Sequence, residues 1–404
     1  MGRERESTRE FAGILFGGTI FQVALSMQSS IASPFFNDRG ISPEQIGLLN
    51  SMNWGVISFA SMPSGRLSDL IGRLGPFLFS SIFGAAACLL ISVKADFSTA
   101  SLLYLVMGLS VALFTPNASA FISEISESSK ITFLFAIFYL VTLAGAAIGS
   151  VVSGWSSKNL WSESPFLFAS ILFLLSGVVY LVLFRRERRQ SSRRSNLGAV
   201  VSSIDVRAMI STIRKSPRLG FYGFSLFFHA LGFLMISPYV SLYSQKVVGL
   251  DISGVGLVIA AWNVGLVVGS LPWAWASTKR GSRYVLLGHF VLSSLSWLLF
   301  SFATDLTSAI VFGLILGIVG AMDLPARRTI TVELAGNGRL GEAMGFIELI
   351  NGMGGLFGAA IGGLIWERLG PTFPFYLAAM MTLISVPPVL VVIRDINNKD
   401  GKQN

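Results

Sequence analysis

Twelve long apolar runs alternate with shorter polar segments along the chain, six before and six after one long polar interval. A helix that spans a membrane needs about 20 apolar residues, and the runs lack the ten-residue alternation of β-barrel strands. The pattern therefore predicts an all-α integral membrane protein with twelve transmembrane helices. We place these helices at 11–34, 46–64, 76–94, 99–121, 131–154, 164–184, 219–243, 253–276, 284–303, 307–326, 341–365 and 373–393.

The long polar interval at 185–218 holds ten of the chain's 30 Lys and Arg residues. Because such a cationic block crosses a bilayer poorly, we expect it on the cytoplasmic side. It then divides the chain into an N-terminal six-helix bundle (1–184), a cytoplasmic linker (185–218) and a C-terminal six-helix bundle (219–404). With both termini cytoplasmic, 25 of the 30 cations lie inside, which favours a multi-pass protein of the plasma membrane in this orientation.

Composition agrees with a lipid environment. The chain is 52% apolar and only 13% charged, whereas soluble domains carry about 25% charged residues. The net charge of +9 comes from cations in the loops, so it indicates membrane orientation and not nucleic-acid binding. Cys88 is the single cysteine, which excludes an internal disulfide and a cysteine-based metal site. We expect no metal and no cofactor. The sequence has no nucleotide-binding loop of the Gly-x4-Gly-Lys-(Ser/Thr) type, which argues against transport driven directly by ATP.

The second half of the chain repeats the first at an offset of 209 residues. The matched positions are Gly47 and Gly256, Gly72 and Gly281, Pro116 and Pro325, Glu124 and Glu333, and Lys130 and Arg339. The string GAAIG recurs at 145–149 and 358–362, which we attribute to a loop four residues longer before helix 11. The repeat predicts two pseudo-symmetric bundles, an arrangement typical of transporters that move one half against the other around a central site.

The segment 65–73, Gly-Arg-Leu-Ser-Asp-Leu-Ile-Gly-Arg, carries the most specific motif. It resembles the signature of the major facilitator superfamily in the loop between helices 2 and 3. Gly65, Asp69, Gly72 and Arg73 match, whereas two positions where that family usually has cations hold leucine. The twelve helices, the central loop and the repeat also fit this family, so the resemblance covers about residues 11–393 and implies its fold and its transport function.

The resemblance implies a cytoplasmic gate that closes when the protein faces outward. In it Asp69 faces the start of helix 11, and Arg73 pairs with an acid below helix 4, for which Glu124 is the candidate. The acids of helices 4 and 10 are each followed six residues later by a base, which suggests further gate ion pairs; ordinary loop charge is the alternative. The predicted gate comprises Gly65, Asp69, Gly72, Arg73, Glu124, Lys130, Glu333 and Arg339.

Ionisable residues inside a membrane span are costly and usually functional. Three are candidates for proton coupling: Glu348, expected as a buried carboxylate in helix 11, Asp323 in helix 10, and His229 in helix 7. Asp323 precedes Arg327 by four residues, a spacing that permits an ion pair, and the first-half counterparts of this pair are Phe114 and Ala118. A packing histidine and a pair that extends toward the cytoplasm are the alternatives.

Uncharged polar residues and one arginine are candidates for a substrate cavity. In the family that the motif resembles, helices 1, 4, 7 and 10 line this cavity most directly. The candidates are Gln22, Gln28, Asn53, Asn117, Asn263, Arg327 and Asn351.

These observations predict a secondary transporter, not an enzyme, that moves a small organic solute by alternating access. We expect proton coupling and favour export. A uniporter, an organic-anion importer that uses Arg327 and Arg328, and a non-transporting membrane receptor are the alternatives. The expected partners are a small-molecule substrate, protons and the lipid bilayer, with no nucleic acid, and we expect a monomer.

Overall fold

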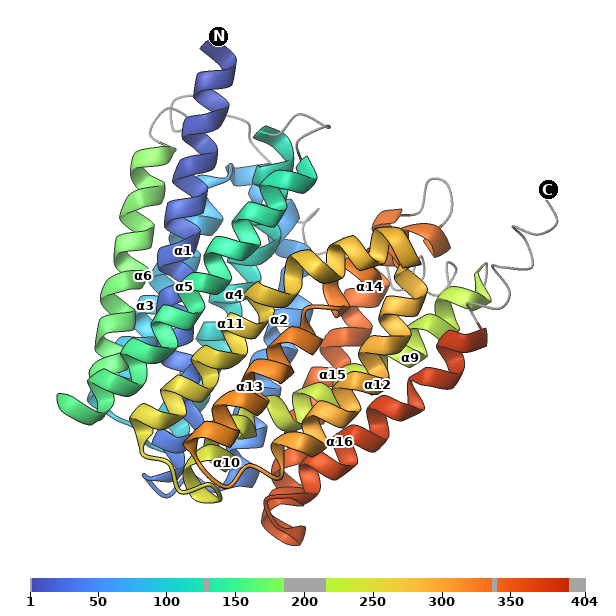
Figure 1. Ribbon diagram of the computed structural model, residues 1–404. Coiled ribbons are helices and arrows are strands. Elements are labelled where there is room, and N and C mark those ends of the chain that lie inside the picture. Colours follow the sequence, from blue (N-terminus) through green and yellow to red (C-terminus); the bar gives the residue numbers. More distant parts are fainter. Residues whose placement is uncertain (1, 126–130, 185–215, 336–339, 392–404) are drawn as a thin grey trace. The chain divides into compact units, whose positions relative to one another are not determined.

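The computed structural model describes residues 2–125, 131–184, 216–335 and 340–391, and these residues contain helices and turns but no strand (Figure 1). The first half contains α1 (Gly2–Asn37), α2 (Pro43–Ile71), α3 (Leu74–Val93), α4 (Phe97–Ile125), α5 (Ile131–Asn159) and α6 (Ser164–Leu183). The second half contains α9 (Pro217–Ile236), η2 (Ser237–Tyr239), α10 (Val240–Lys246), α11 (Ile252–Arg280), α12 (Ser282–Phe300), α13 (Leu306–Gly320), α14 (Asp323–Ala335), α15 (Leu340–Leu369) and α16 (Phe373–Ile384).

Eleven helical segments among the described residues are long and apolar enough to cross a membrane. The exception among the expected spans is α2, which has 29 residues but carries Asn50, Ser51 and Asn53 near its middle. These polar residues lower its hydropathy while leaving its length sufficient for a span. The prediction of an all-α membrane protein is confirmed.

The chain forms two compact units. Unit 1 consists of Met1–Ile41, Gly55–Ile204 and Leu250–Asn263, and unit 2 consists of Ser42–Trp54, Asp205–Gly249 and Val264–Asn404. Unit 2 thus includes the first part of α2, and unit 1 includes the first part of α11. These two segments correspond at the 209-residue offset to within one residue. Nearly all of the predicted linker 185–218 lies outside the described residues.

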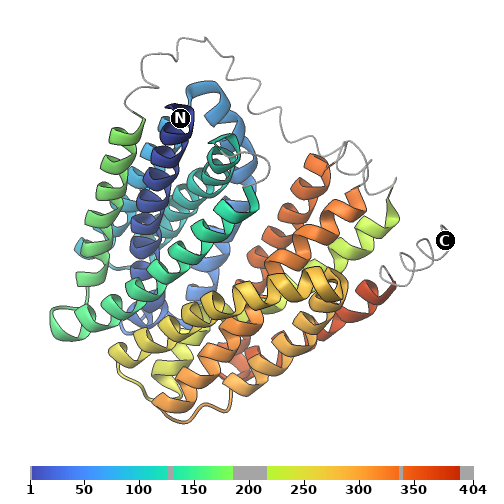
Figure 2. The ribbon, with the colours of Figure 1, turned by 45° about the horizontal axis from the view of Figure 1, so that its top comes forward.

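Helix packing follows the same pattern in both units (Figures 1 and 2). In unit 1, α1 packs against α5 and α6, and α3 packs against α4 and α6. In unit 2, α9 packs against α15 and α16, and α12 packs against α13, α14 and α16. The core of unit 1 is aromatic, with the rings of Phe21 and Phe114 stacked 4.0 Å apart and those of Phe77 and Tyr180 4.7 Å apart.

Helix boundaries confirm the repeat. Helix α2 covers 43–71 and α11 covers 252–280, while α5 begins at residue 131 and α15 at residue 340, so both pairs are 209 residues apart. The turns that follow α2 and α11 also match, since Gly72 has φ 84° and Gly281 has φ 91°. Glycine adopts this left-handed conformation without the steric cost of a side chain. Gly72 and Gly281 therefore allow a tight turn directly after α2 and α11.

Glycine contacts of α5 and α15 show how these two helices correspond, and they correct the interpretation of the two GAAIG strings. A Cβ added at Gly149 would lie 2.5 Å from the carbonyl oxygen of Val23 on α1, and one at Gly358 would lie 2.4 Å from that of Leu231 on α9. These glycines are structurally equivalent and lie 209 residues apart. The longer loop inferred from the second GAAIG string is wrong, because α5 and α15 themselves begin at this offset.

Two predicted helices of the second half are interrupted. The helix expected at 219–243 divides into α9, η2 and α10 around Pro238, and the one expected at 307–326 divides into α13 and α14 at the turn Ala321–Met322. Helix α14 also covers most of the loop expected at 327–340. Pro325 cannot donate a backbone hydrogen bond to Ala321. Proline alone does not cause the break, however, because α4 continues through the equivalent Pro116.

Side chains from neighbouring helices satisfy the carbonyl groups near this break. The Nε1–H group of Trp273 donates to the carbonyl oxygen of Ile318 at 2.8 Å. The Nδ1 atom of His289 lies 3.0 Å from the carbonyl oxygen of Val319. A backbone carbonyl that leaves the helical hydrogen-bond pattern inside a membrane needs such a partner. Trp273 of α11 and His289 of α12 therefore place polar groups beside the break between α13 and α14.

Candidate functional site

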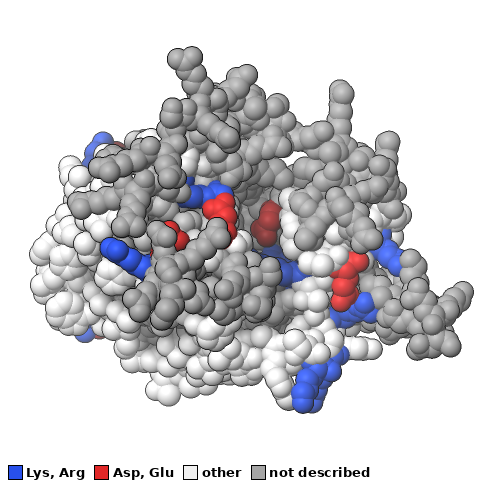
Figure 3. All heavy atoms as spheres, turned by 90° about the horizontal axis from the view of Figure 1, so that it is seen from above, with Lys and Arg blue, Asp and Glu red and all other residues white. Residues whose placement is uncertain are grey.

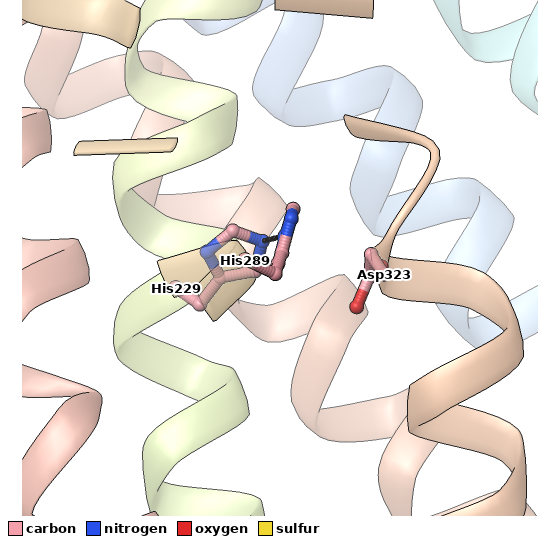
Figure 4. Close-up of side chains that lie close together, drawn as sticks. All are labelled: His229, His289 and Asp323. Carbon is pink, nitrogen blue, oxygen red and sulfur yellow. Dashed lines mark hydrogen bonds between the residues drawn. The ribbon is translucent and has the colours of Figure 1, made fainter. Parts of the chain in front are cut away.

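The two histidines of the chain meet inside unit 2, next to the break between α13 and α14. Helix α9 positions His229 and helix α12 positions His289, and both side chains are buried. Their Nε2 atoms lie 3.1 Å apart (Figure 4). The ring of His229 also stacks on Trp297, with centroids 5.9 Å apart. Aromatic packing therefore fixes one imidazole, while the helix break fixes the other.

Hydrogen bonding determines which nitrogen of His289 carries a proton. Its Nδ1 atom lies 3.0 Å from the carbonyl oxygen of Val319 and 3.2 Å from Oγ of Ser293. A carbonyl oxygen only accepts hydrogen bonds, so Nδ1 of His289 is the donor. The lone pair of the neutral ring then lies on Nε2, the atom that faces His229.

Asp323 completes this cluster as the first residue of α14 (Figure 4). Its Oδ2 atom accepts from Arg327 at 3.1 Å, so the ion pair expected from the spacing is present. Its Oδ1 atom is buried without a hydrogen-bond partner among the residues that the structure describes. One potential ligand atom from each of His229, His289 and Asp323 lies within 4.8 Å of the other two.

Glu348 differs from the expectation of a buried acid. Its side chain is exposed, whereas the preceding residues Phe346 and Ile347 are buried. Helix α15 turns those two apolar residues inward, which leaves Glu348 outside the core. The predicted burial of Glu348 is wrong. It makes no hydrogen bond or ion pair within the described part of the chain.

The cavity candidates are divided between the two units, and their common cavity stays a prediction. Gln22, Gln28, Asn117 and Asn263 belong to unit 1, and Asn53, Arg327 and Asn351 belong to unit 2.

Within unit 1, Asn263 joins a hydroxyl cluster that sequence inspection missed. Its Nδ2 atom lies 3.4 Å from Oγ of Ser150, which is 2.8 Å from Oγ of Ser26 and 2.9 Å from Oγ of Ser30. Asn117 is fully buried and donates to the carbonyl oxygen of Leu113 at 2.6 Å. The contact with Ser150 joins α11 to α5, whereas the hydrogen bond of Asn117 lies within its own helix α4.

One ion pair at the ends of helices α2 to α4 agrees with the sequence prediction. Arg73 donates through Nε to Oε2 of Glu124 at 3.1 Å and also binds Ser68. Unit 2 has a corresponding pair, in which Arg283 donates to Oε2 of Glu333 at 2.9 Å. Acidic and basic side chains adjoin on the face shown in Figure 3. Arg283 lies one residue beyond the position equivalent to Arg73, a signal in the sequence that went unused.

The remaining gate candidates receive no structural description. Lys130 and Arg339 lie outside the described residues, and the structure does not describe the surroundings of Gly65 or the side chain of Asp69. The ion pairs proposed for Lys130 and Arg339 therefore stay predictions. The described partners of Glu124 and Glu333 are arginines that follow α2 and α11 in sequence.

Comparison with known proteins identifies similar sequences along the whole chain. The family model described as Major Facilitator Superfamily matches residues 14–255 and 222–404. An uncharacterized MFS-type transporter of Methanocaldococcus jannaschii is 24% identical over 85% of this chain and 88% of its own length. Multidrug resistance protein MdtG of Enterobacter lignolyticus is 25% identical over 84% and 80%. Proton-coupled antiporter flippase LtaA of Staphylococcus saprophyticus is 24% identical over 65% and 64%.

Proposed function

The chain belongs to the Major Facilitator Superfamily, and on that premise we propose that it is a proton-coupled exporter of small amphipathic organic molecules. It is a multi-pass membrane transporter and not an enzyme. The proposal concerns what it carries, in which direction, and what drives it. We further propose that it works as a monomer in the plasma membrane with both termini in the cytoplasm, as the distribution of Lys and Arg favours.

Alternating access follows from two similar units that can move about a shared site. The Arg73–Glu124 pair in unit 1 and the Arg283–Glu333 pair in unit 2 hold helix ends together within each unit. We assign them to the cytoplasmic gate, where each keeps its own unit rigid while the gate opens.

Glu348 carries the proposal of proton coupling. It lies in the span Ala343–Leu369, its side chain is exposed, and it lacks a partner among the described residues. An acid of this kind exchanges protons with water without first breaking an ion pair. Asp323 and Arg327, by contrast, neutralise each other. One charge that crosses 100 mV contributes about 2.3 kcal/mol, which biases a two-state equilibrium roughly fiftyfold.

The names of relatives support the direction and the substrate class. One similar protein is named a multidrug resistance protein and another a proton-coupled antiporter flippase. The first name supports export of organic molecules, and the second supports proton coupling. The anion importer is less favoured, because Arg327 already binds Asp323.

Transport in proteoliposomes tests this proposal. The full chain is reconstituted with an amphipathic fluorescent dye, and dye movement driven by a pH gradient is measured beside dye exchange without a gradient. We expect Glu348→Gln to lose gradient-driven transport at least tenfold while exchange survives. Glu367→Gln, at the other end of α15, is the matched control and should keep both activities.

Other outcomes decide between the alternatives. Unchanged gradient-driven transport in Glu348→Gln would reject this residue as the coupling acid. Exchange without any proton movement in the unaltered protein would indicate a uniporter. Absence of both activities across a panel of anionic, neutral and cationic dyes would favour the non-transporting receptor.

A further inference from the structure

The cluster in unit 2 contains the ligand set of a metal site. We propose that His229, His289 and Asp323 bind one divalent transition-metal ion, of which Zn²⁺ is the physiological example and Co²⁺ a spectroscopic substitute. The sequence alone does not bring these three residues together, because they are 34 to 94 positions apart. The inference goes beyond the proposed transport function and does not depend on it.

The separation of the two imidazoles fits a shared metal ion. In a tetrahedral site with Zn–N distances of about 2.0–2.1 Å, two histidine nitrogens lie about 3.3 Å apart. The Nε2 atoms of His229 and His289 are 3.1 Å apart. A metal ion that bridges them therefore requires little movement of either helix.

The surroundings of His289 also fit a metal ligand. Histidines that bind metals commonly donate their second ring N–H to a backbone carbonyl or a carboxylate, which fixes the ring and its tautomer. Nδ1 of His289 makes this bond with the carbonyl oxygen of Val319. The Nε2 lone pair is consequently directed at the centre of the cluster before any ion arrives.

Two buried polar atoms of the cluster have no partner within the described residues. They are Oδ1 of Asp323 and Nδ1 of His229. A buried polar atom without a partner costs about 1–3 kcal/mol, so such atoms call for an explanation. Coordination would give Oδ1 of Asp323 a partner once it moves about 1–2 Å toward the imidazoles; Nδ1 of His229 would carry the ring proton and is not explained by the ion. Its other oxygen stays with Arg327, as carboxylate ligands are often held by a second hydrogen bond.

Unit 1 shows that the fold does not require ionisable residues here. The positions 209 residues before His229, His289 and Asp323 hold Ile20, Ser80 and Phe114, and Phe114 stacks on Phe21 in the core. The equivalent space in unit 1 is therefore filled by apolar and small side chains. The cluster in unit 2 is a specialised feature of that unit.

The donor set selects the kind of ion. Two imidazoles and one carboxylate suit Zn²⁺, Co²⁺ and Ni²⁺, whereas Ca²⁺ and Mg²⁺ prefer sites made of oxygen atoms. Three protein ligands leave a tetrahedral ion with one further position, which water can occupy. The positive charge of Arg327 opposes the ion, so we expect a reversible site and not a permanently occupied one.

Cobalt absorption tests the site directly. The full chain is purified in detergent with an affinity tag that contains no histidine, and Co²⁺ is added while visible absorption is recorded. We expect saturable absorption at one Co²⁺ per chain, displaced by Zn²⁺. Because the chain has two histidines, no other site can supply imidazole ligands to the ion.

Substitutions complete the test. His229→Asn and His289→Asn should each reduce the cobalt signal at least tenfold, and Asp323→Asn should weaken binding. Asp251→Asn, an exposed carboxylate of unit 1, is the matched control and should bind as the unaltered chain does. Size-exclusion profiles and thermal unfolding without metal show whether each variant is folded. Absence of saturable absorption in the unaltered chain, or an unchanged signal in a folded His289→Asn variant, would overturn the site and leave only a hydrogen-bonded histidine pair.

Discussion

Unit 1 and unit 2 use the same helix arrangement for different chemistry. Helices α2 and α11 begin and end 209 residues apart, α5 and α15 begin at the same offset, and Gly149 and Gly358 each approach a carbonyl group of the facing helix. The contrast lies in the interior. Unit 1 has a continuous α4 and an aromatic core around Phe114, whereas unit 2 has a broken helix and the cluster of His229, His289 and Asp323.

This contrast separates what the fold needs from what one unit has acquired. Close glycine contacts occur in both units, so they belong to the shared scaffold. Buried ionisable groups occur in the equivalent space of unit 2 alone within the described residues, so stability does not require them there. Since such groups are costly inside a membrane, their presence in one unit points to function.

The largest expected effect comes from giving unit 2 the residues of unit 1. Asp323→Phe removes the carboxylate that binds Arg327, whose side chain is only 14% exposed. Breaking a buried ion pair by removing one partner costs about 3–5 kcal/mol. Adding Arg327→Ala reproduces the Phe114 and Ala118 of unit 1 and should recover most of that loss. Reversible unfolding in detergent measures both variants.

Arg328→Ala is the control for this experiment, because the neighbouring Arg328 is exposed and should change stability little. If the double variant is no more stable than Asp323→Phe alone, then the two units differ in scaffold as well as in chemistry. The comparison would then fail at its central point.

A second prediction tests the shared scaffold. Gly149→Ala and Gly358→Ala each place a methyl group about as close to a backbone carbonyl oxygen of the facing helix, at 2.5 Å and 2.4 Å. Overpacking of this kind costs about 1–3 kcal/mol, and we expect the two losses to agree within about 0.5 kcal/mol. Thermal unfolding of the purified variants measures them.

Gly288→Ala is the control, since its added methyl group would meet only the flexible end of Met322 at 3.3 Å. A large loss at one of the two glycines and none at the other would show that α5 and α15 are not equivalent.

The parts of the fold that sequence reasoning recovered depend on one-dimensional signals. Apolar length predicts each span, and a fixed offset predicts the repeat. The same reasoning failed at α15, where the position of the GAAIG string disagreed with the 209-residue offset. The GAAIG string suggested an insertion, whereas Gly149 and Gly358 are equivalent in space because each meets a carbonyl group of the facing helix. Steric contact, and not the identity of a short string, decides equivalence.

The candidate site was harder to predict. His229 and Asp323 stood out as ionisable residues in apolar runs, but His289 was missed because its contacts with His229 and Val319 arise only in the tertiary structure. The histidine count was an available clue, since both histidines of a 404-residue chain lie in apolar runs. The helix break was not predictable from Pro325, because Pro116 occupies the same place in an unbroken helix. Glu348 was misplaced because sequence gives depth along a helix but not the face.

The smallest expected effect concerns a surface ion pair between the end of α5 and the start of α11 in unit 1. Lys158 at the end of α5 binds Asp251 before α11 at 2.6 Å, whereas Ser42, the counterpart of Asp251, has no charge.

The hydrogen bond from Lys158 lowers the pKa of Asp251. A carboxylate with a lowered pKa stabilises the folded state above its unfolded pKa of about 3.9, and this contribution is lost as pH falls through the lower folded value. Both side chains are about half exposed, so the pair contributes only about 0.2–1 kcal/mol. Asp251→Asn keeps an acceptor for the N–H of Gly254 but removes the charge, so its stability should fall slightly below that of the unaltered chain at pH 7, and this difference should shrink as pH falls below about 3.9. Thermal unfolding of both proteins from pH 7 to pH 3 measures this difference. A gap that stays constant over the whole range would assign the effect to the cap of α11 and not to the ion pair.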